Sequence, residues 1–282
     1  MRLPDVSREG GRGGPPPERR THQSLGLSFS GNSSADTLEL ALQGGLVLAP
    51  AAPPLAGDFM EDPCYREALL RADFVLPDSG AMVLLWNFAH LLSPAKRLSR
   101  LSGLEFLKSL VAKLSAHPEI RSFWIMPSEA EQSADLRWLH TRGLARVSES
   151  DCYVAPNYAA KNLVDGSGMR DPLLLGKLEA VRPNVIVVNL GGGIQEKLGL
   201  FLKQELSFKP SIICTGAAIA FLSGSQASIP GWADRYYLGW FLRVMHAPKK
   251  FGPRYFRAMK IIWLLARYGE KLPRVPAKIK SN

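Results

Sequence analysis

The sequence contains little cysteine, and this scarcity excludes several classes of protein. Only three cysteines occur in 282 residues, and Cys64, Cys152 and Cys214 lie far apart. An odd number of distant cysteines does not form the disulfide framework on which small secreted domains depend. No CxxC pair and no Cys/His cluster has the spacing of a zinc site. This usage is typical of proteins of the reducing cytoplasm.

Long apolar runs are also missing. The longest stretch without a charged residue, Pro210–Ala233, is interrupted by Pro, Gly, Ser, Thr and Gln. A membrane-spanning helix needs about 20 mainly apolar residues, so no segment of the sequence predicts one. The N-terminus lacks the apolar segment of a signal peptide. Residues 1–23 are rich in Gly, Pro and Arg, and we expect them to form a disordered leader.

Acidic residues are scarce toward the C-terminus. Residues 235–282 contain twelve Lys and Arg but a single acid, Glu270, so this segment has a net charge of +11. The whole chain has a net charge of +10, which leaves residues 1–234 nearly neutral. A strongly basic segment attached to a neutral body favours a phosphate-bearing partner, such as lipid headgroups, a nucleotide or nucleic acid.

What the sequence does contain is the alternation typical of an α/β fold. With 46% hydrophobic residues, the chain has enough apolar mass for one large domain or two small ones. Val185–Leu190 is a β-branched run between Pro183 and Gly191, a pattern typical of a buried parallel strand. Similar short runs alternate with segments of helical periodicity. We therefore expect a Rossmann-like, mostly parallel sheet flanked by helices on both faces.

The expected elements can be given by residue range. We predict strands over 24–30, 46–49, 74–76, 122–126, 185–190 and 212–215. We predict helices over 63–71, 81–92, 103–116, 129–142 and 173–181, and one capped by Asp36 with Glu39 in capping-box position. The α/β domain should occupy residues 24–232, and residues 233–282 should form a basic, aromatic segment that associates with a membrane.

Three segments are predicted to follow a strand and precede a helix: 77–80, 191–196 and 215–218. Ligands of open parallel sheets bind beyond the carboxyl ends of the strands, where these segments should lie. Gly191–Gly193 can bring backbone N–H groups close to a phosphate at a helix N-terminus. It is not a dinucleotide fingerprint, because Glu196 stands where the third glycine should be. A tight strand-to-helix turn without a ligand is the alternative.

Asp78 stands where a predicted strand ends, and two interpretations are open. It can cap the helix that begins near Ala81, as Asp commonly does. It can also direct a carboxylate into the ligand cleft and accept a proton. Arg100, which precedes another predicted helix, is either a surface arginine or a partner for a phosphate.

The segment from Arg254 to Lys271 is expected to form an amphipathic helix. Its basic residues fall on one side, and most of its aromatic and aliphatic residues fall on the other. This combination favours a membrane-surface element. A helix packed on the body with a solvated charged face is the alternative.

Several short motifs occur in a fixed order along the chain. They are Asp62-Pro63-Cys64-Tyr65-Arg66-Glu67-Ala68, Ala72-Asp73-Phe74-Val75-Leu76-Pro77-Asp78, Arg100-Leu101-Ser102-Gly103, Leu190-Gly191-Gly192-Gly193-Ile194-Gln195-Glu196, Gly216-Ala217-Ala218, Pro230-x-Trp232 and Trp240-Phe241-x-Arg243. Their order over about Ser24–Tyr268 resembles the bacterial WecG/TagA/CpsF glycosyltransferases, glycosyltransferase family 26. The corresponding family patterns begin D-P-x-[FY]-R-E-A, A-D-x-V-x-P-D, R-V-[ST]-G and L-G-x-P-x-Q-E.

The resemblance implies an inverting transfer of a hexose, N-acetylmannosamine or a related sugar, from a UDP-sugar to an undecaprenyl-diphosphate-linked sugar. Such products serve cell-surface polysaccharide and exopolysaccharide biosynthesis. It implies no metal and no other cofactor. The expected partners are the UDP-sugar, the lipid-linked glycan acceptor and an anionic membrane surface. The expected location is the cytoplasm, peripherally on the inner face of the bacterial plasma membrane. The oligomeric state stays open, a homo-oligomer included.

The resemblance also assigns roles to residues. Asp78 matches the family's catalytic carboxylate, and inverting transfer needs one base to take the proton of the acceptor hydroxyl. Gln195 would donate to the uridine diphosphate, and cations would steady the diphosphate. The expected substrate-binding residues are Arg100, Ser102, Gly103, Gly191, Gly192, Gln195, Glu196, Gly216 and Arg243.

Two other hypotheses belong to different classes of function. The family's polar T-P-N segment falls at Pro50–Ala52, where only Ala and Pro occur, so the chain can also be a degenerate relative that binds sugar nucleotide or lipid-linked glycan without turnover. A basic nucleic-acid-binding module rests on the charge of the tail alone. No helix-turn-helix, RNP-like or zinc pattern supports it, and we expect no nucleic-acid partner.

Overall fold

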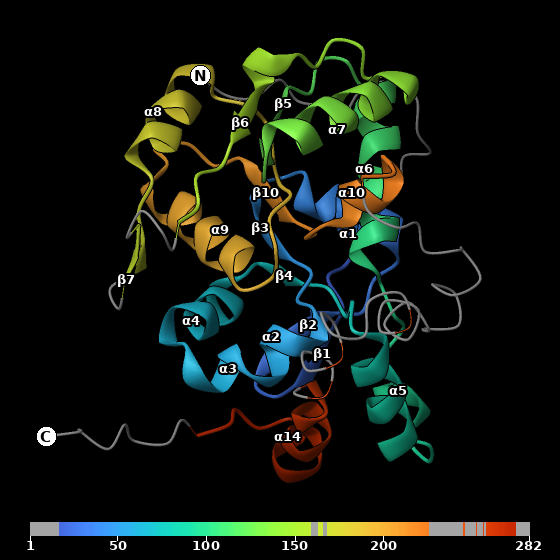
Figure 1. Cartoon of the computed structure of the whole chain (residues 1–282). Helices are drawn as coiled ribbons and strands as arrows, with labels where there is room; N and C mark the ends of the chain where they lie inside the picture. The colour runs from blue at the N-terminus through green and yellow to red at the C-terminus, as the bar shows by residue number, and fades with distance from the viewer. Residues whose placement is uncertain are drawn as a thin grey trace, which may run out of the picture.

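An eight-stranded sheet lies at the centre of the computed structural model, which describes residues 17–158, 163–165, 168–225 and 258–274 together with Met245, Gly252 and Phe256. The strand order is β1-β2-β4-β3-β10-β9-β5-β6, and every pairing is parallel except the β1–β2 hairpin at one edge (Figure 1). The strands are β1 (Thr21–Ser24), β2 (Leu27–Ser30), β3 (Gly45–Leu48), β4 (Phe74–Val75), β5 (Ser122–Met126), β6 (Cys152–Val154), β9 (Val185–Val188) and β10 (Ser211–Cys214). A separate antiparallel pair joins β7 (Val164–Asp165) to β8 (Gly168–Met169).

Helices cover both faces of the sheet, so the predicted α/β fold is confirmed. One face carries α1 (Ser34–Ala41), α6 (Gly103–Ala116), α7 (Glu129–Thr141) and α10 (Ala218–Leu222). The other carries α2 (Ala52–Ala56), α3 (Asp58–Glu61), α4 (Pro63–Arg71), α5 (Gly80–Ala89), α8 (Pro172–Val181), α9 (Ile194–Glu205) and α14 (Lys260–Tyr268). In Figure 1 the two groups flank the sheet as separate layers.

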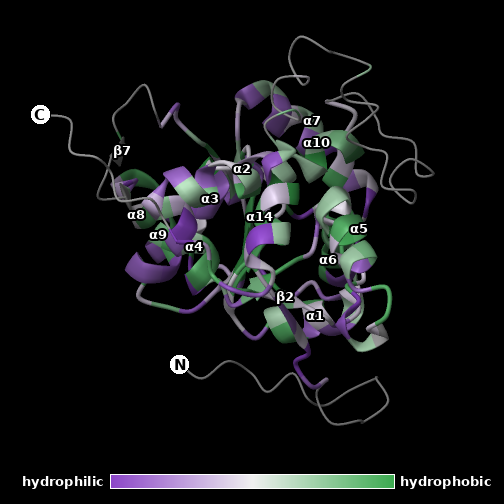
Figure 2. Cartoon of the chain, turned by 90° about the horizontal axis from the view of Figure 1, so that it is seen from below, coloured by the Kyte–Doolittle hydropathy of each residue, from purple (hydrophilic) through white to green (hydrophobic). Residues whose placement is uncertain are grey.

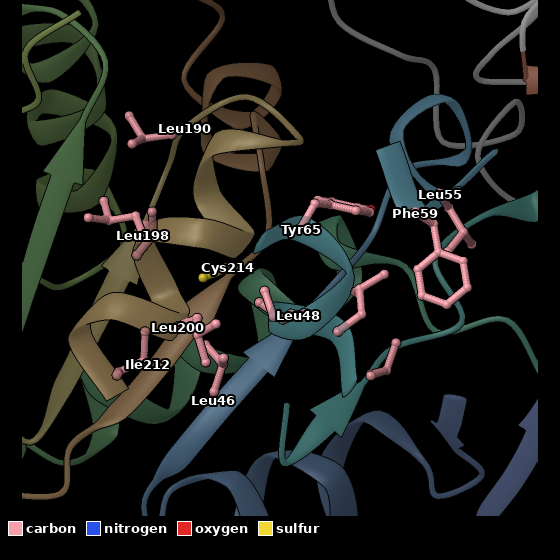
Figure 3. Close-up of a cluster of buried hydrophobic side chains, with 14 of the residues drawn as sticks. Leu46, Leu48, Leu55, Phe59, Tyr65, Leu190, Leu198, Leu200, Ile212 and Cys214 are labelled. Carbon is pink, nitrogen blue, oxygen red and sulfur yellow. The ribbon is translucent and has the colours of Figure 1, made fainter. Parts of the chain in front are cut away.

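The two layers are held by two apolar clusters that share the strands between them. In β9, Val185 and Val187 point into the α6 side while Ile186 and Val188 point into the α9 side. Side chains alternate along a strand, so a strand buried on both faces must be apolar at every position. Figure 3 shows the second cluster, in which side chains of β3 and β10 meet those of α4 and α9.

Several predicted elements have the expected bounds. Helices over 63–71 and 103–116 and a strand over 122–126 are confirmed as α4, α6 and β5. The other predicted strands after residue 45 and the helices near 81–92, 129–142 and 173–181 are present with ends that differ by up to three residues. Asp62 caps α4 by accepting the backbone N–H of Cys64 and of Tyr65, which explains why the helix begins at Pro63.

The prediction of one strand over Ser24–Ser30 is wrong. Leu25 and Gly26 have positive φ angles of 54° and 73°, and they form a tight turn that folds the segment into the β1–β2 hairpin. Glycine is needed at position 26, because a Cβ there would lie 2.6 Å from the Cβ of Leu272. The first strand therefore begins at Thr21, within the residues expected to form a disordered leader. Residues 1–16 lie outside the described part.

The predicted cap of the first helix is also wrong. The N-cap is Ser33, whose hydroxyl accepts the backbone N–H of Asp36, so Asp36 lies in the first turn of α1. Ser33 is an equally good capping residue three positions earlier. The buried positions Thr37, Leu38 and Ala41 then face the sheet.

The C-terminal helix α14 is shorter than the segment predicted for it, and it uses a different face. Ile261 and Leu264 are buried against the body, whereas Ile262 and Trp263 are exposed. The backbone N–H groups of Leu25 and Gly26 donate to the carbonyls of Gly269 and Glu270, which fixes the end of the helix to the β1–β2 turn. The alternative of a helix packed on the body is therefore confirmed for the face of Ile261 and Leu264, whereas the membrane-surface interpretation stays a prediction. The predicted domain boundary at Trp232 lies outside the described residues.

Candidate functional site

The three segments singled out from the sequence lie at one edge of the sheet. Because β4, β3, β10, β9 and β5 are parallel neighbours, the loops that follow them emerge at their common carboxyl ends. These loops supply Asp78 after β4, Ala49 after β3, Thr215 and Gly216 after β10, and Asn189 and Gly191 after β9.

Asp78 is half-buried and holds the start of α6. Its Oδ1 accepts the backbone N–H of Gly103, the first residue of α6, at 2.9 Å. The capping interpretation had named the wrong helix, because Ser79 is the N-cap of α5 and accepts the N–H of Met82. The Asp78 side chain thus joins the loop after β4 to the first residue of α6.

The residues predicted around Asp78 are brought together with it. The Nε of Arg100 donates to the backbone carbonyl of Asp78 at 2.9 Å. Ser102 is the buried N-cap of α6, with its hydroxyl accepting the N–H of Glu105. The segment from Arg100 to Gly103 thus contacts Asp78 twice, at its backbone carbonyl through Arg100 and at its carboxylate through Gly103.

Gly103 sets how close this turn comes to the sheet. A Cβ at Gly103 would lie 3.1 Å from the Cβ of Ala49 and 3.2 Å from the carbonyl oxygen of Thr215. The start of α6 therefore rests directly on the loops after β3 and β10. This close approach places Asp78 beside the carboxyl ends of the central strands.

The glycine loop after β9 leads into α9. Gly193 has a φ of 94°, and its N–H donates to Oε2 of Glu196 at 2.7 Å, so Glu196 closes the first turn of the helix. Gly191 is exposed, and a Cβ there would meet nothing within 4 Å. There is open space in front of Gly191, on the side where a ligand would reach the helix N-terminus.

Gln195 ties the glycine loop to the loop after β10. Its Oε1 accepts the N–H of Gly216 at 2.6 Å, and its Nε2 donates to Oε1 of Glu196 at 3.2 Å. The side chain is buried, and Gly216 can approach it because it adopts a φ of 68°. In this arrangement the carboxamide oxygen and one N–H are used inside the protein. A donation to diphosphate, the role expected of Gln195, would come from the second N–H of the same amide.

Glu196 is fully buried behind the same loop. Burial, with a smaller contribution from the nearby Asp58, raises the pKa of its carboxyl to about 7, against the opposing effect of the N–H of Gly193 and the carboxamide of Gln195. Glu196 therefore holds the glycine loop from its buried side, by accepting the N–H of Gly193.

Three residues at this edge were missed by the sequence analysis. Asn189 and Thr215 directly follow β9 and β10, and Asp135 lies on the inner face of α7; all three are buried. Of the six buried side-chain oxygens without a hydrogen-bond partner in the described residues, four belong to Asp135, Asn189 and Thr215. A polar residue that ends a wholly apolar strand is a signal the sequence offered for Asn189 and Thr215. A single acid in a helix offers no comparable signal.

A cavity of about 120 Å³ lies beside these residues. Pro127, Glu131, Asp135, Asn189, Gly191, Ala217, Ile219 and Ala220 line it. A larger hollow of about 290 Å³ lies along α3 and α4 and is lined by none of the predicted site residues. The smaller cavity is the one at the carboxyl edge, so we consider it part of the site.

Comparison with known proteins decides the family. The model of the glycosyl transferase WecG/TagA/CpsF family matches residues 24–274, which is most of the chain. The chain belongs to this family. The match begins in β1 and ends beyond α14, so it takes in both the sheet and the C-terminal helix.

Two curated relatives are hexosyltransferases of the same family. The chain is 23% identical over 221 residues to an N-acetylglucosaminyldiphosphoundecaprenol N-acetyl-β-D-mannosaminyltransferase of Bacillus spizizenii, covering 78% of each protein. It is 23% identical over 207 residues to the enzyme of the same name from Bacillus subtilis, covering 72% of this chain and 73% of the relative. With the family match, these likenesses make the chain a glycosyltransferase.

Two further positions were singled out by the family resemblance. The first, Arg243, lies outside the described residues. The apolar segment in place of T-P-N follows β3 at the carboxyl edge, where Ala49 packs close to Gly103.

Within the described ranges, no cluster of three or more His, Cys, Asp or Glu could hold a metal ion. In the same ranges, no helix has the length and apolar character needed to cross a bilayer.

Proposed function

We propose that the protein is an inverting glycosyltransferase that moves N-acetylmannosamine or a related hexose from a UDP-sugar to an undecaprenyl-diphosphate-linked sugar. Its product would enter cell-surface polysaccharide or exopolysaccharide biosynthesis. The observation that carries this proposal is the Asp78 carboxylate at the start of α6, at the same edge of the sheet as the glycine loop of α9. The names of the two relatives support the lipid-linked acceptor and the sugar that is transferred.

Asp78 is the general base in this proposal. Its carboxylate takes the proton of the acceptor hydroxyl as that oxygen forms a bond to the anomeric carbon of the donor. The bond from this carbon to the diphosphate breaks on the opposite face of the ring, and the electron pair leaves with UDP. Attack and departure on opposite faces invert the anomeric centre. A well-placed base contributes ~10²–10⁴-fold to such a reaction.

The leaving diphosphate needs positive charge and N–H donors. The exposed loop Gly191–Gly192 precedes α9 and offers the start of a helix to an anion. Arg100 brings a guanidinium next to Asp78, and the family resemblance adds Arg243. With these groups in the place of a metal ion, we expect activity to survive EDTA.

The proposed acceptor is attached to lipid, and α5 and α14 offer a surface for the membrane. The two helices lie side by side, and Figure 2 shows apolar residues on both. Phe88 is 74% exposed and Leu92, just beyond α5, is 98% exposed, while Trp263 on α14 is 58% exposed. In the described residues, Leu84, Phe88, Leu91, Leu92, Met259, Ile262 and Trp263 form what we call the α5–α14 apolar surface.

Basic residues occur close in sequence to these apolar side chains. Arg97 follows α5, Lys260 and Arg267 lie in α14, and Lys271 follows α14. Apolar side chains flanked by Lys and Arg favour anionic lipid, and each well-placed cation contributes about 1 kcal/mol. Because α5 begins two residues after Asp78, this surface would bring the base to the lipid on which the acceptor is carried. We propose a peripheral position on the inner face of the bacterial plasma membrane.

The direct test is a transfer assay with the full chain. UDP release and formation of a disaccharide lipid are measured with UDP-N-acetylmannosamine and other UDP-hexoses, in the presence of undecaprenyl-diphosphate N-acetylglucosamine in detergent micelles. We expect acceptor-dependent UDP release with at least one donor, in EDTA as in its absence. UDP binding without transfer from any donor would instead favour the degenerate relative, which the apolar segment Pro50–Ala52 motivates.

A further inference from the structure

We propose that Asp135 and Asn189 form a subsite that binds the nucleoside end of the donor through its hydrogen-bond-donating groups. The inference rests on the proposed function, because it assumes a nucleotide-linked donor. It concerns residues that neither the motifs nor the family resemblance had singled out.

The first observation is an unusual concentration of unsatisfied polar atoms. Both carboxylate oxygens of Asp135 and Oδ1 of Asn189 have no hydrogen-bond partner within the part of the chain that the structure describes, although Asp135 is wholly buried and Asn189 is 2% exposed. The amide of Asn189 is held from its other end, where Nδ2 donates to Sδ of Met126 at 3.4 Å. Buried acceptors without donors destabilise a fold, so their presence at one place points to a ligand that satisfies them.

The second observation is the cavity that these residues line. Asp135 from α7 and Asn189 from the end of β9 both border the hollow of about 120 Å³, and Gly191 forms part of the same wall. This volume accommodates a single small ring and is too small for a whole sugar nucleotide. The subsite therefore takes one end of the donor, with the exposed Gly191 marking the side from which the rest of the molecule enters.

The position of this cavity relative to Asp78 gives the donor a direction. The loops after β4 and β9 are three strands apart, and neighbouring strands are about 4.8 Å apart, so Asp78 and Asn189 are separated by roughly 14 Å along the edge. The glycine loop lies on the Asn189 side of this span. A donor laid along the edge would place its hexose by Asp78, its diphosphate at Gly191–Gly192 and its nucleoside in the cavity.

The chemistry of the subsite is that of an acceptor. A carboxylate and an amide oxygen accept hydrogen bonds, so the matching ligand edge must donate. The ribose hydroxyls and the N3–H of uracil are such donors. The hydroxyl of Ser223 lies close enough to Asp135 to lower the pKa of this carboxyl as a donor does, but it is outside hydrogen-bonding geometry with both oxygens and contacts the hydroxyl of Ser225 at 3.0 Å. Burial raises the pKa of Asp135 to about 6, with Ser223 opposing the shift and Glu131 adding to it, so at neutral pH the group is mostly the charged, acceptor form.

The test is binding of UDP to the full chain by titration calorimetry, with Asp135→Asn as the variant and Glu129→Gln as the control. Both changes remove one acid from α7, but Glu129 is exposed in its first turn. We expect Asp135→Asn to weaken UDP binding roughly 10- to 100-fold, as the loss of a charged hydrogen bond does, and Glu129→Gln to leave it unchanged. Melting temperature gives the second readout. Removal of an unpaired buried carboxylate should leave it equal or higher, whereas a structural role predicts a fall.

Two further nucleotides identify the donating group. 2′-Deoxy-UDP lacks one ribose hydroxyl, and CDP lacks the N3–H. We expect at least one of them to bind the wild-type protein more weakly than UDP, with a smaller difference in Asp135→Asn. The inference is overturned if Asp135→Asn binds UDP as the wild type does, or if all three nucleotides bind equally. If the wild-type protein binds no uridine nucleotide at all, the donor of the proposed function falls too.

Discussion

At the scale of single residues, the side chains of the site form hydrogen bonds with the protein's own loops and helix ends. Asp78 holds the start of α6, Gln195 joins two loops, and Glu196 closes the first turn of α9. The sequence motifs identified these residues because their types and order resemble a family. The motifs did not reveal that Gln195 and Glu196 are buried, since burial depends on how α9 packs between α4 and β10.

The buried carboxyl of Glu196 predicts a pH dependence of stability. Its pKa is about 7 in the folded protein, against an ordinary value of 4.5, so the folded state binds more protons between these pH values than the unfolded state. The free energy of unfolding should therefore fall as pH rises from about 4.5 to 7. Asp135, with a pKa of about 6, should add to the fall.

The variant that tests this is Glu196→Gln, followed by urea unfolding between pH 4.5 and 7.5. We expect it to reduce the decrease in stability across that range by on the order of 2 kcal/mol. The slope is compared and not the absolute stability, because the amide has one acceptor oxygen where the carboxylate accepts from both Gly193 and Gln195. Glu205→Gln, at the exposed end of α9, is the control and should keep the wild-type slope. An unchanged slope in Glu196→Gln would show that Glu196 is ionised throughout.

Gly103 gives a second prediction at this scale. A methyl group at Gly103 would press on Ala49 and on the backbone of Thr215, so Gly103→Ala should shift the start of α6 away from the sheet. We expect a loss of about 1–3 kcal/mol in stability, measured by urea unfolding, together with lower transfer activity. The matched control is Gly176→Ala in α8, where a Cβ meets nothing within 4 Å and the change should stabilise by about 0.5–1 kcal/mol. Equal effects of the two substitutions would contradict the packing argument.

At the scale of elements, the sequence predicted those helices and strands whose signals are local. The strand β9 is apolar at every position and ends before glycines, and α4 begins with Asp-Pro, so both could be recognised. Others depend on their surroundings. The strand β6 has only three residues, and α2 contains two prolines at its start. Only the packing of neighbours makes such segments regular.

The face of α14 shows the same limit. Ile261 and Leu264 are the residues of this helix that pack on the body, which its sequence pattern did not predict. Helical periodicity reports that a face is apolar and not what the face contacts. The exposed apolar side of α14 could be interpreted as part of a larger surface only once the structure placed the helix beside α5.

The α5–α14 apolar surface predicts how the protein binds lipid. The double substitution of Leu84→Ser and Phe88→Ser removes two exposed apolar side chains of α5, each worth about 1.5–3 kcal/mol when buried. We expect it to weaken binding to vesicles of phosphatidylglycerol at least 10-fold in a flotation assay, with an unchanged melting temperature. Leu173→Ser, an exposed leucine on α8, is the control and should bind as the wild type does.

The opposite result would assign another occupant to this surface. If the double variant bound vesicles normally but melted at a lower temperature, the surface would be covered by another segment of the chain, and the membrane would have to bind elsewhere.

At the scale of the whole molecule, charge is segregated along the chain. The net charge of +11 on residues 235–282 is attached to a nearly neutral body, so any attraction to anionic lipid comes from one end. Vesicle binding should therefore weaken as salt rises from 50 to about 300 mM, because screening shortens the reach of these charges. Binding to neutral phosphatidylcholine vesicles should be weaker and insensitive to salt. Salt-independent binding to anionic vesicles would contradict an electrostatic contribution.

The central claim is that one carboxylate takes the acceptor proton, and Asp78→Asn tests it most directly. The amide oxygen can still accept the N–H of Gly103, so the fold should be kept while the proton acceptor is lost. Glu105→Gln, an exposed acid in the same turn of α6, is the control. We predict that Asp78→Asn lowers kcat by ~10²–10⁴-fold in the transfer assay, with unchanged UDP binding, while Glu105→Gln keeps full activity. An Asp78→Asn protein that transfers sugar at the wild-type rate would contradict the account.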